Sequence, residues 1–222
     1  MGDMIQRAAI ENIGHYLARA VKDGNDIEAR EHVAYANTMS GYSMVVTSCI
    51  SEHSMEHAMS AYHPELPHGA GLIMLSKEYF TFWINKHVCD KRFVDMAHFL
   101  GMEDASKPED FITALLELQK ACGVDDLKMS DYGIKKEEAM TLARNARATM
   151  MRLFVRDPQE TTDEEIAGIY EAPTNKDVTF TEEESKDMTY GDKAAKVKVV
   201  DYAFVNPILN NWIDQWNRTI NN

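Results

Sequence analysis

The spacing of hydrophobic residues predicts α-helices along most of the first 170 residues. Apolar residues recur at intervals of three and four, which places them on one face of a helix. Aspartate, glycine and proline interrupt this pattern at several points and mark helix ends. The predicted helices cover residues 5–21, 26–47, a histidine-rich segment that ends before Pro64, and then residues 66–86, 90–100, 107–121, 134–153 and 162–170. The expected fold class is therefore mainly α, in the form of a helical bundle.

Several predicted helix ends carry local signals. Asp26 suits the N-cap of the second helix, and Pro108 suits the first turn of the sixth. The sequence TDEE, which begins at Thr162, resembles a capping box. Gly101 and Gly123 follow the fifth and sixth helices, where glycine commonly ends a helix. These signals set the expected boundaries between neighbouring helices.

The composition changes near Pro173, which divides the chain into a helical domain over residues 1–172 and a tail over residues 173–222. The first part of the tail is polar and acidic, as in a linker. Residues 196–205 are enriched in β-branched and aromatic residues and predict a short strand. An amphipathic helix is predicted from Pro207, with one apolar face formed by Ile208, Leu209, Trp212, Ile213 and Trp216.

The apolar face of the tail has several possible uses. It could pack on the helical domain, cover a surface left bare on that domain, dock a partner, or form a contact between copies of the chain. Trp212 and Trp216 lie four residues apart and are natural anchors in each case. We favour packing on the chain's own domain as the simplest of these uses.

Four histidines, His53, His57, His63 and His68, lie within sixteen residues. His53 and His57 are four apart and share one face of the predicted helix. His68 lies between a proline and a glycine, which suits a loop or a helix start. Imidazoles from two consecutive segments can hold a divalent metal ion, although the same spacing also occurs on solvated helix faces that bind no metal.

This segment resembles the metal-binding signature of the iron-containing alcohol dehydrogenases. Members of that family carry HxxxH on a helix, followed about ten residues later by PHG, which correspond here to His53 with His57 and to residues 67–69. Residues 26–43 and 71–86 resemble the family's helices on either side. The resemblance covers about residues 1 to 170 and implies the fold of the family's C-terminal helical domain.

The resemblance also implies roles for three of the four histidines. His53 and His68 match two ligands of the family's metal, which implies Fe²⁺ or Zn²⁺ as the cofactor. His57 matches a catalytic histidine that lies near the substrate and helps to relay a proton. His63 matches no residue with a role, although it or His57 could serve as a third ligand.

The sequence departs from the family pattern in two respects. The family's remaining ligands are an aspartate and a histidine four residues apart, and no aspartate in this chain has a histidine four residues later. No GxGxxG segment marks a nucleotide-binding loop. Two neutral histidines hold a hard ferrous ion poorly, whereas zinc or nickel suits nitrogen ligands better.

Two functions are therefore expected. The first is the metal-binding helical half of an oxidoreductase that transfers hydride between a small alcohol or aldehyde and NAD(P). The chain alone is then inactive, and NAD(P) binds only if a nucleotide-binding domain is supplied. The possible partners are such a nucleotide-binding domain or further copies of the chain in a homo-oligomer. The alternative is a non-catalytic remnant or engineered helical domain that acts as a binding or assembly module through its tail.

Composition narrows the range of partners and compartments. The formal net charge of −13 over 222 residues argues against nucleic acid and anionic membranes as partners. The three cysteines form no CxxC pattern and predict reduced thiols in a cytoplasmic protein. No apolar run approaches the length of a transmembrane helix. The many methionines and the aromatic run at residues 79–83 predict core packing rather than a cofactor platform.

Overall fold

The computed structural model describes residues 2–174, which form eight α-helices and two short 3-10 helices. In chain order the elements are α1 (Gly2–Lys22), α2 (Ile27–Val46), α3 (Ser51–Tyr62), α4 (His68–Asn85), α5 (Asp90–Phe99), α6 (Glu109–Ala121), η1 (Met129–Tyr132), η2 (Lys136–Glu138), α7 (Ala139–Phe154) and α8 (Asp163–Thr174). The described residues contain no β-strand, so the prediction of a mainly α fold is confirmed. The predicted strand and amphipathic helix of the tail lie outside the described residues.

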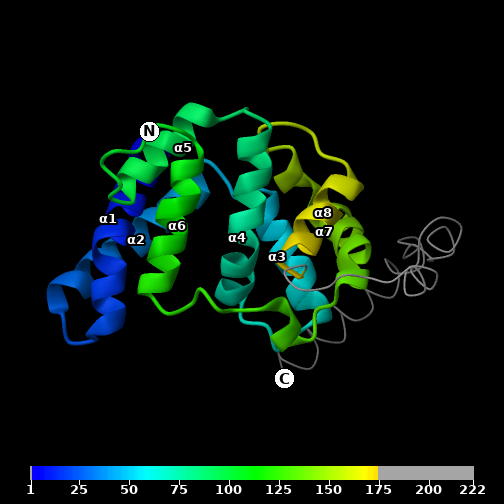
Figure 1. Cartoon of the computed structure of the whole chain (residues 1–222), viewed down its shortest axis with the longest axis horizontal. Helices are drawn as coiled ribbons and strands as arrows, with labels where there is room; N and C mark the ends of the chain where they lie inside the picture. The colour runs from blue at the N-terminus through cyan, green and yellow to red at the C-terminus, as the bar shows by residue number, and fades with distance from the viewer. Residues whose placement is uncertain (1, 175–222) are drawn as a thin grey trace, which may run out of the picture. The chain divides into compact units, whose positions relative to one another are not determined.

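Helix α4 is the central element of the helical domain. It packs against α3, α6 and α8, and Figure 1 shows it between α6 and α3. Helices α1 and α2 form a hairpin, and α1 also contacts α5 and α6. Helix α3 packs on α7, which in turn packs on α8. The long apolar helix predicted from the sequence therefore joins two groups of helices.

The hydrophobic core is built around the aromatic run of α4. Tyr79 and Trp83 are buried, and Met55 and Met59 of α3 are buried in the same core cluster. These side chains confirm the prediction of core packing for the aromatic run and for part of the methionines. Met4, Met44 and Met151 do not follow it, because they are 76%, 55% and 52% exposed.

Three helices begin at least two residues later than the sequence predicts. Helix α4 begins at His68 rather than Leu66, α6 begins at Glu109 rather than Lys107, and α7 begins at Ala139 rather than Ile134. Leu66 and Ile134 are nevertheless buried in the core. Both residues lie in the connection before the helix and pack into the core from there. The hydrophobic pattern alone does not distinguish a buried residue in a connection from a buried residue in a helix.

The predicted helix-end signals are largely confirmed. The Asp26 carboxylate accepts the Ala29 N–H at 3.0 Å and caps α2. The capping box before α8 is also present, since the Thr162 N–H donates to Glu165 and the Glu165 N–H donates to Thr162 Oγ1. Pro108 immediately precedes α6 rather than lying in its first turn.

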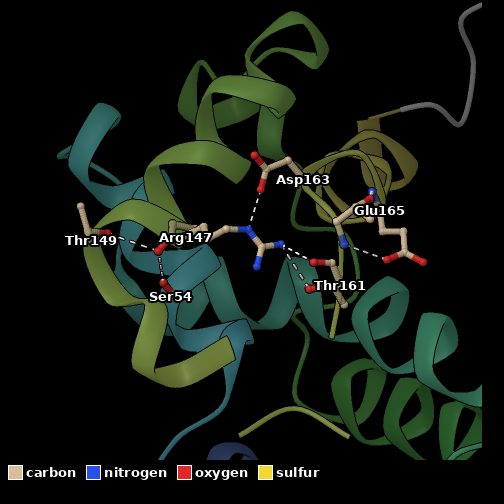
Figure 2. Close-up of polar contacts among 8 residues, drawn as sticks. Ser54, Arg147, Thr149, Thr161, Asp163 and Glu165 are labelled. Atoms are coloured by element: carbon tan, nitrogen blue, oxygen red, sulfur yellow. Dashed lines mark hydrogen bonds and ion pairs between the residues drawn. The ribbon is translucent and has the colours of Figure 1, made fainter. Parts of the chain in front are cut away.

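Polar side chains connect α7 to α3 and to the start of α8. Figure 2 shows Arg147 of α7 between Asp163 and Thr161; its Nε donates to Asp163 at 2.6 Å and its Nη2 to the Thr161 carbonyl at 2.8 Å. The Ser54 hydroxyl of α3 donates to the Ala146 carbonyl of α7 at 2.7 Å. The Ser54 contact ties α3, the helix that carries two of the candidate histidines, to α7.

Helix α2 exposes a set of large apolar side chains, namely Ile27, Tyr35, Tyr42, Met44, Val45 and Val46. Exposed apolar groups that gather on one element are typical of contact surfaces. None of the described helices combines the length and the apolar character needed to cross a lipid bilayer.

Ser48 lies between α2 and α3 with a φ of 108°, a conformation that favours glycine. The substitution Ser48→Gly is expected to raise the free energy of unfolding by about 1 kcal/mol, because relief of about 1–3 kcal/mol of strain exceeds the entropic cost of glycine. Urea denaturation followed by circular dichroism measures the change. The control Ser40→Gly within helix α2 should lower stability by about 0.5 kcal/mol. Destabilisation by both substitutions would contradict the proposed backbone strain at Ser48.

Candidate metal centre

Three of the four histidines meet where α3 faces the start of α4. His53 and His57 lie one turn apart on α3, with ring centroids 6.4 Å apart. His68 is the first residue of α4, and its ring lies 5.2 Å from that of His53 and 5.3 Å from that of His57. The structure therefore brings together the three residues to which the sequence assigned roles.

The connection between α3 and α4 places His68 in this position. The His63 N–H donates to the Met59 carbonyl at 2.8 Å and ends α3, and the Leu66 N–H donates to the His63 carbonyl at 2.9 Å. Pro67 has extended backbone angles, so the chain enters α4 at His68. The buried Leu66 side chain anchors this connection in the core.

His63 lies apart from this group. Its Nε2 is 3.3 Å from a carboxylate oxygen of Glu138, at the end of η2 just before α7. The structure therefore associates His63 with the α3–α7 side of the fold, which does not support a role as a third metal ligand.

The sequence did not reveal Glu56, which is a buried carboxylate beside the histidines. Its side chain is 1% exposed, and one carboxylate oxygen contacts His68 Nδ1 while the other accepts the Ser60 hydroxyl. Glu56 shares the core-facing side of α3 with Met55 and Met59, and this position is the only signal that could have identified it. One donor atom from each of Glu56, His57 and His68 lies within 4.8 Å of the others.

The surroundings of the site affect the protonation of its residues. Burial lowers the pKa of His53, and the nearby His68 and His57 lower it further. The neutral ring is the form in which an imidazole binds a metal ion. Burial also raises the pKa of Glu52, the neighbour of His53, to about 8.

A hydrogen-bonded group holds the start of α3, one turn before the histidines. The Ser51 N–H donates to Asp157 Oδ1 at 3.0 Å, and the Tyr79 hydroxyl donates to the same oxygen at 3.1 Å. Burial, and then the charge of Asp157, raises the pKa of Tyr79. Asp157 therefore caps α3 from the loop after α7, which the sequence did not indicate.

Comparison with known proteins places this domain among the alcohol dehydrogenases. The chain is 27% identical to the long-chain primary alcohol dehydrogenase AdhA of Thermoanaerobacter ethanolicus, over 76% of this chain and 43% of the relative. It is 32% identical to the NAD-dependent methanol dehydrogenase of Bacillus methanolicus, over 62% of this chain and 36% of the relative. The crystal structure of the archaeal halo-thermophilic Red Sea brine pool alcohol dehydrogenase ADH/D1 matches with a TM-score of 0.68 and 27% identity, over 78% of this chain and 44% of the other.

The fold and these matches define an oxidoreductase domain of the alcohol dehydrogenase type. Residues 1–174 match the C-terminal part of the Fe-containing alcohol dehydrogenase family, and the chain belongs to that family. It spans less than half the length of the relatives described above. The resemblance inferred from the histidine motif is therefore confirmed.

Proposed function

We propose that this chain is the metal-binding helical half of an alcohol dehydrogenase, which transfers hydride between an alcohol or aldehyde and NAD(P). The observation that carries the proposal is the meeting of three imidazoles, from His53, His57 and His68, in a domain of this family. The names of the relatives include methanol and long-chain primary alcohols as substrates, which supports an alcohol as the substrate class.

His53 and His68 are the proposed ligands of Fe²⁺ or Zn²⁺. Imidazole nitrogen suits both ions, and the two rings come from different helices with centroids 5.2 Å apart. The donor set therefore fits a divalent metal ion, to which these residues contribute two ligands. A divalent ion bound there would polarise the alcohol oxygen as a Lewis acid.

His57 is the proposed catalytic residue. It is exposed one helical turn from His53, and its ring lies 5.3 Å from that of His68. This position lets its imidazole accept a proton released beside the metal ligands and pass the proton to solvent. Its proposed role is therefore proton relay rather than metal ligation.

The relatives contain a further region that this chain does not match. We propose that an equivalent of this region supplies the remaining parts of the site. These parts are the nucleotide-binding domain and two further metal ligands, an aspartate and a histidine. Because the nicotinamide must lie against the reacting carbon, we expect no alcohol-dependent reduction of NAD(P) by this chain alone.

Isothermal titration with Zn²⁺, and with Fe²⁺ under anoxic conditions, tests the metal-binding part of the proposal. We expect a dissociation constant on the order of micromolar or tighter, and its loss in a His53→Ala, His68→Ala double variant. A His15→Ala, His98→Ala double variant is the control, since both histidines lie outside the site. Equal binding by all three proteins, or binding by none, would contradict the proposal.

A further inference from the structure

Glu56 is a buried carboxylate with a partner at each oxygen. A glutamate is rarely fully buried unless it is paired, because desolvation of the charge is costly. The Ser60 hydroxyl donates to Oε1 at 2.5 Å, and His68 Nδ1 contacts Oε2. Both carboxylate oxygens are therefore engaged inside the protein.

Helix α4 is shaped to admit this carboxylate. A Cβ atom at Gly71 would lie 2.7 Å from Glu56 Cγ and 3.0 Å from Oε1, so a larger residue would displace the side chain. A Cβ atom at Gly69, in the same turn of α4, would meet nothing within 4 Å. Glycine is thus required for close packing at position 71 and not at position 69.

We infer that Glu56 is a positioning residue that fixes the orientation and tautomer of His68. The role of His68 as a metal ligand rests on the proposed function. The hydrogen bond between Glu56 and His68 does not depend on that function. An ionised carboxylate only accepts hydrogen bonds, so the neutral His68 ring must carry its proton on Nδ1. Nε2 then keeps its lone pair on the side of the ring away from Glu56.

The exposure of the pair supports this arrangement. The Glu56 side chain is 1% exposed, whereas that of His68 is 49% exposed. The buried carboxylate therefore holds the inner edge of a ring whose opposite edge is accessible to an arriving ion. Carboxylates behind ligating histidines fix the ring and raise its basicity in many metal sites.

Direct ligation by Glu56 is the competing arrangement, since one of its donor atoms lies within 4.8 Å of donor atoms of His57 and His68. Ligation would require one carboxylate oxygen to leave its present partner, either Ser60 or His68. The observed contacts therefore favour a carboxylate that supports a ligand rather than one that binds the ion.

Nitrogen-15 NMR of the metal-free chain, at a pH where His68 is neutral, tests the tautomer directly. We expect the proton on Nδ1 in the unmodified chain, and a shift toward the Nε2–H form in Glu56→Met, which removes the acceptor. Glu56→Gln keeps an acceptor and should restore the Nδ1–H form. Gly71→Ala should shift the tautomer as Glu56→Met does, and the control Gly69→Ala should not. A His68 proton on Nε2 in the unmodified chain would overturn the inference.

Zinc titration of the same variants separates this inference from the proposed function. Loss of an outer carboxylate partner should weaken Zn²⁺ binding about 10- to 100-fold in Glu56→Met, with no change in Gly69→Ala. Equal zinc affinity in Glu56→Met and the unmodified chain would overturn the role of Glu56. Failure of the unmodified chain to bind zinc would refute the proposed metal site, while the tautomer would still decide whether Glu56 orients His68.

Discussion

The substitution Trp83→Ala is expected to lower the free energy of unfolding by about 3–5 kcal/mol, the range typical of buried aromatic residues replaced by alanine. Trp83 is 2% exposed in α4, and its ring packs edge-on against Tyr79 and Phe82 with centroids 6.2 and 4.9 Å away. Because α4 contacts α3, α6 and α8, a cavity at Trp83 weakens both groups of helices. Urea denaturation at equilibrium measures the loss.

Phe82 provides a matched control next to Trp83. It is only partly buried, so Phe82→Ala should cost clearly less than Trp83→Ala. Trp83→Phe, which keeps an aromatic ring in the core, should also cost less. Equal losses in Trp83→Ala and Phe82→Ala would contradict the placement of α4 at the centre of the fold.

The substitution Asp157→Ala is expected to lower the free energy of unfolding by about 3 kcal/mol. Asp157 accepts hydrogen bonds from the Ser51 N–H and the Tyr79 hydroxyl, and an unpaired buried donor costs about 1–3 kcal/mol. The exposed Asp104 is the control, and Asp104→Ala should change stability by no more than about 0.5 kcal/mol. A small effect at Asp157, comparable to that at Asp104, would contradict its role as the cap of α3.

The stability due to Asp157 should also depend on pH. Burial raises the pKa of this carboxyl, although hydrogen bonds from Ser51 and Tyr79 oppose the shift. The folded state therefore binds the proton more tightly than the unfolded state, whose aspartate pKa is about 3.9. This contribution is fully present below that value and is lost as the pH rises through the raised folded pKa.

Comparison with Asp157→Asn, which cannot titrate, isolates this effect from the other carboxylates. The stability of the unmodified chain relative to the variant should fall as the pH rises above about 4. Denaturation curves at a series of pH values measure this difference. If the stability of the unmodified chain relative to Asp157→Asn rises with pH, the surroundings stabilise the ionised carboxylate, and the prediction is contradicted.

Local sequence was sufficient to predict most helices, whereas the resemblance to the family implied that His53, His57 and His68 belong to one site. His53 and His57 share a helix face because they are four apart, and the extended Pro67 makes His68 the start of the next helix. The predicted start of α7 was wrong because Ile134, which lies before η2, continues the apolar pattern of the helix. An apolar residue in a connection and one in a helix look alike when both fill the core.

The parts of the site that escaped prediction depend on contacts between distant residues. Glu56 resembles an ordinary polar position on α3, and its burial follows from the close approach of α4 at Gly71. Asp157 caps a helix that begins 106 residues earlier in the chain. No local pattern marks either residue, because its role arises only when α3, α4 and α7 pack together.

The ligand assignment of His53 and His68 is the central claim, and a Zn²⁺ titration followed by NMR of the histidine ring nitrogens tests it most directly. We predict that one ring nitrogen of His53 and Nε2 of His68 shift to the values of metal-bound imidazole, while His15, His63 and His98 remain unchanged. Zinc that shifts His63 or the distant histidines, and leaves His53 and His68 unchanged, would contradict the claim.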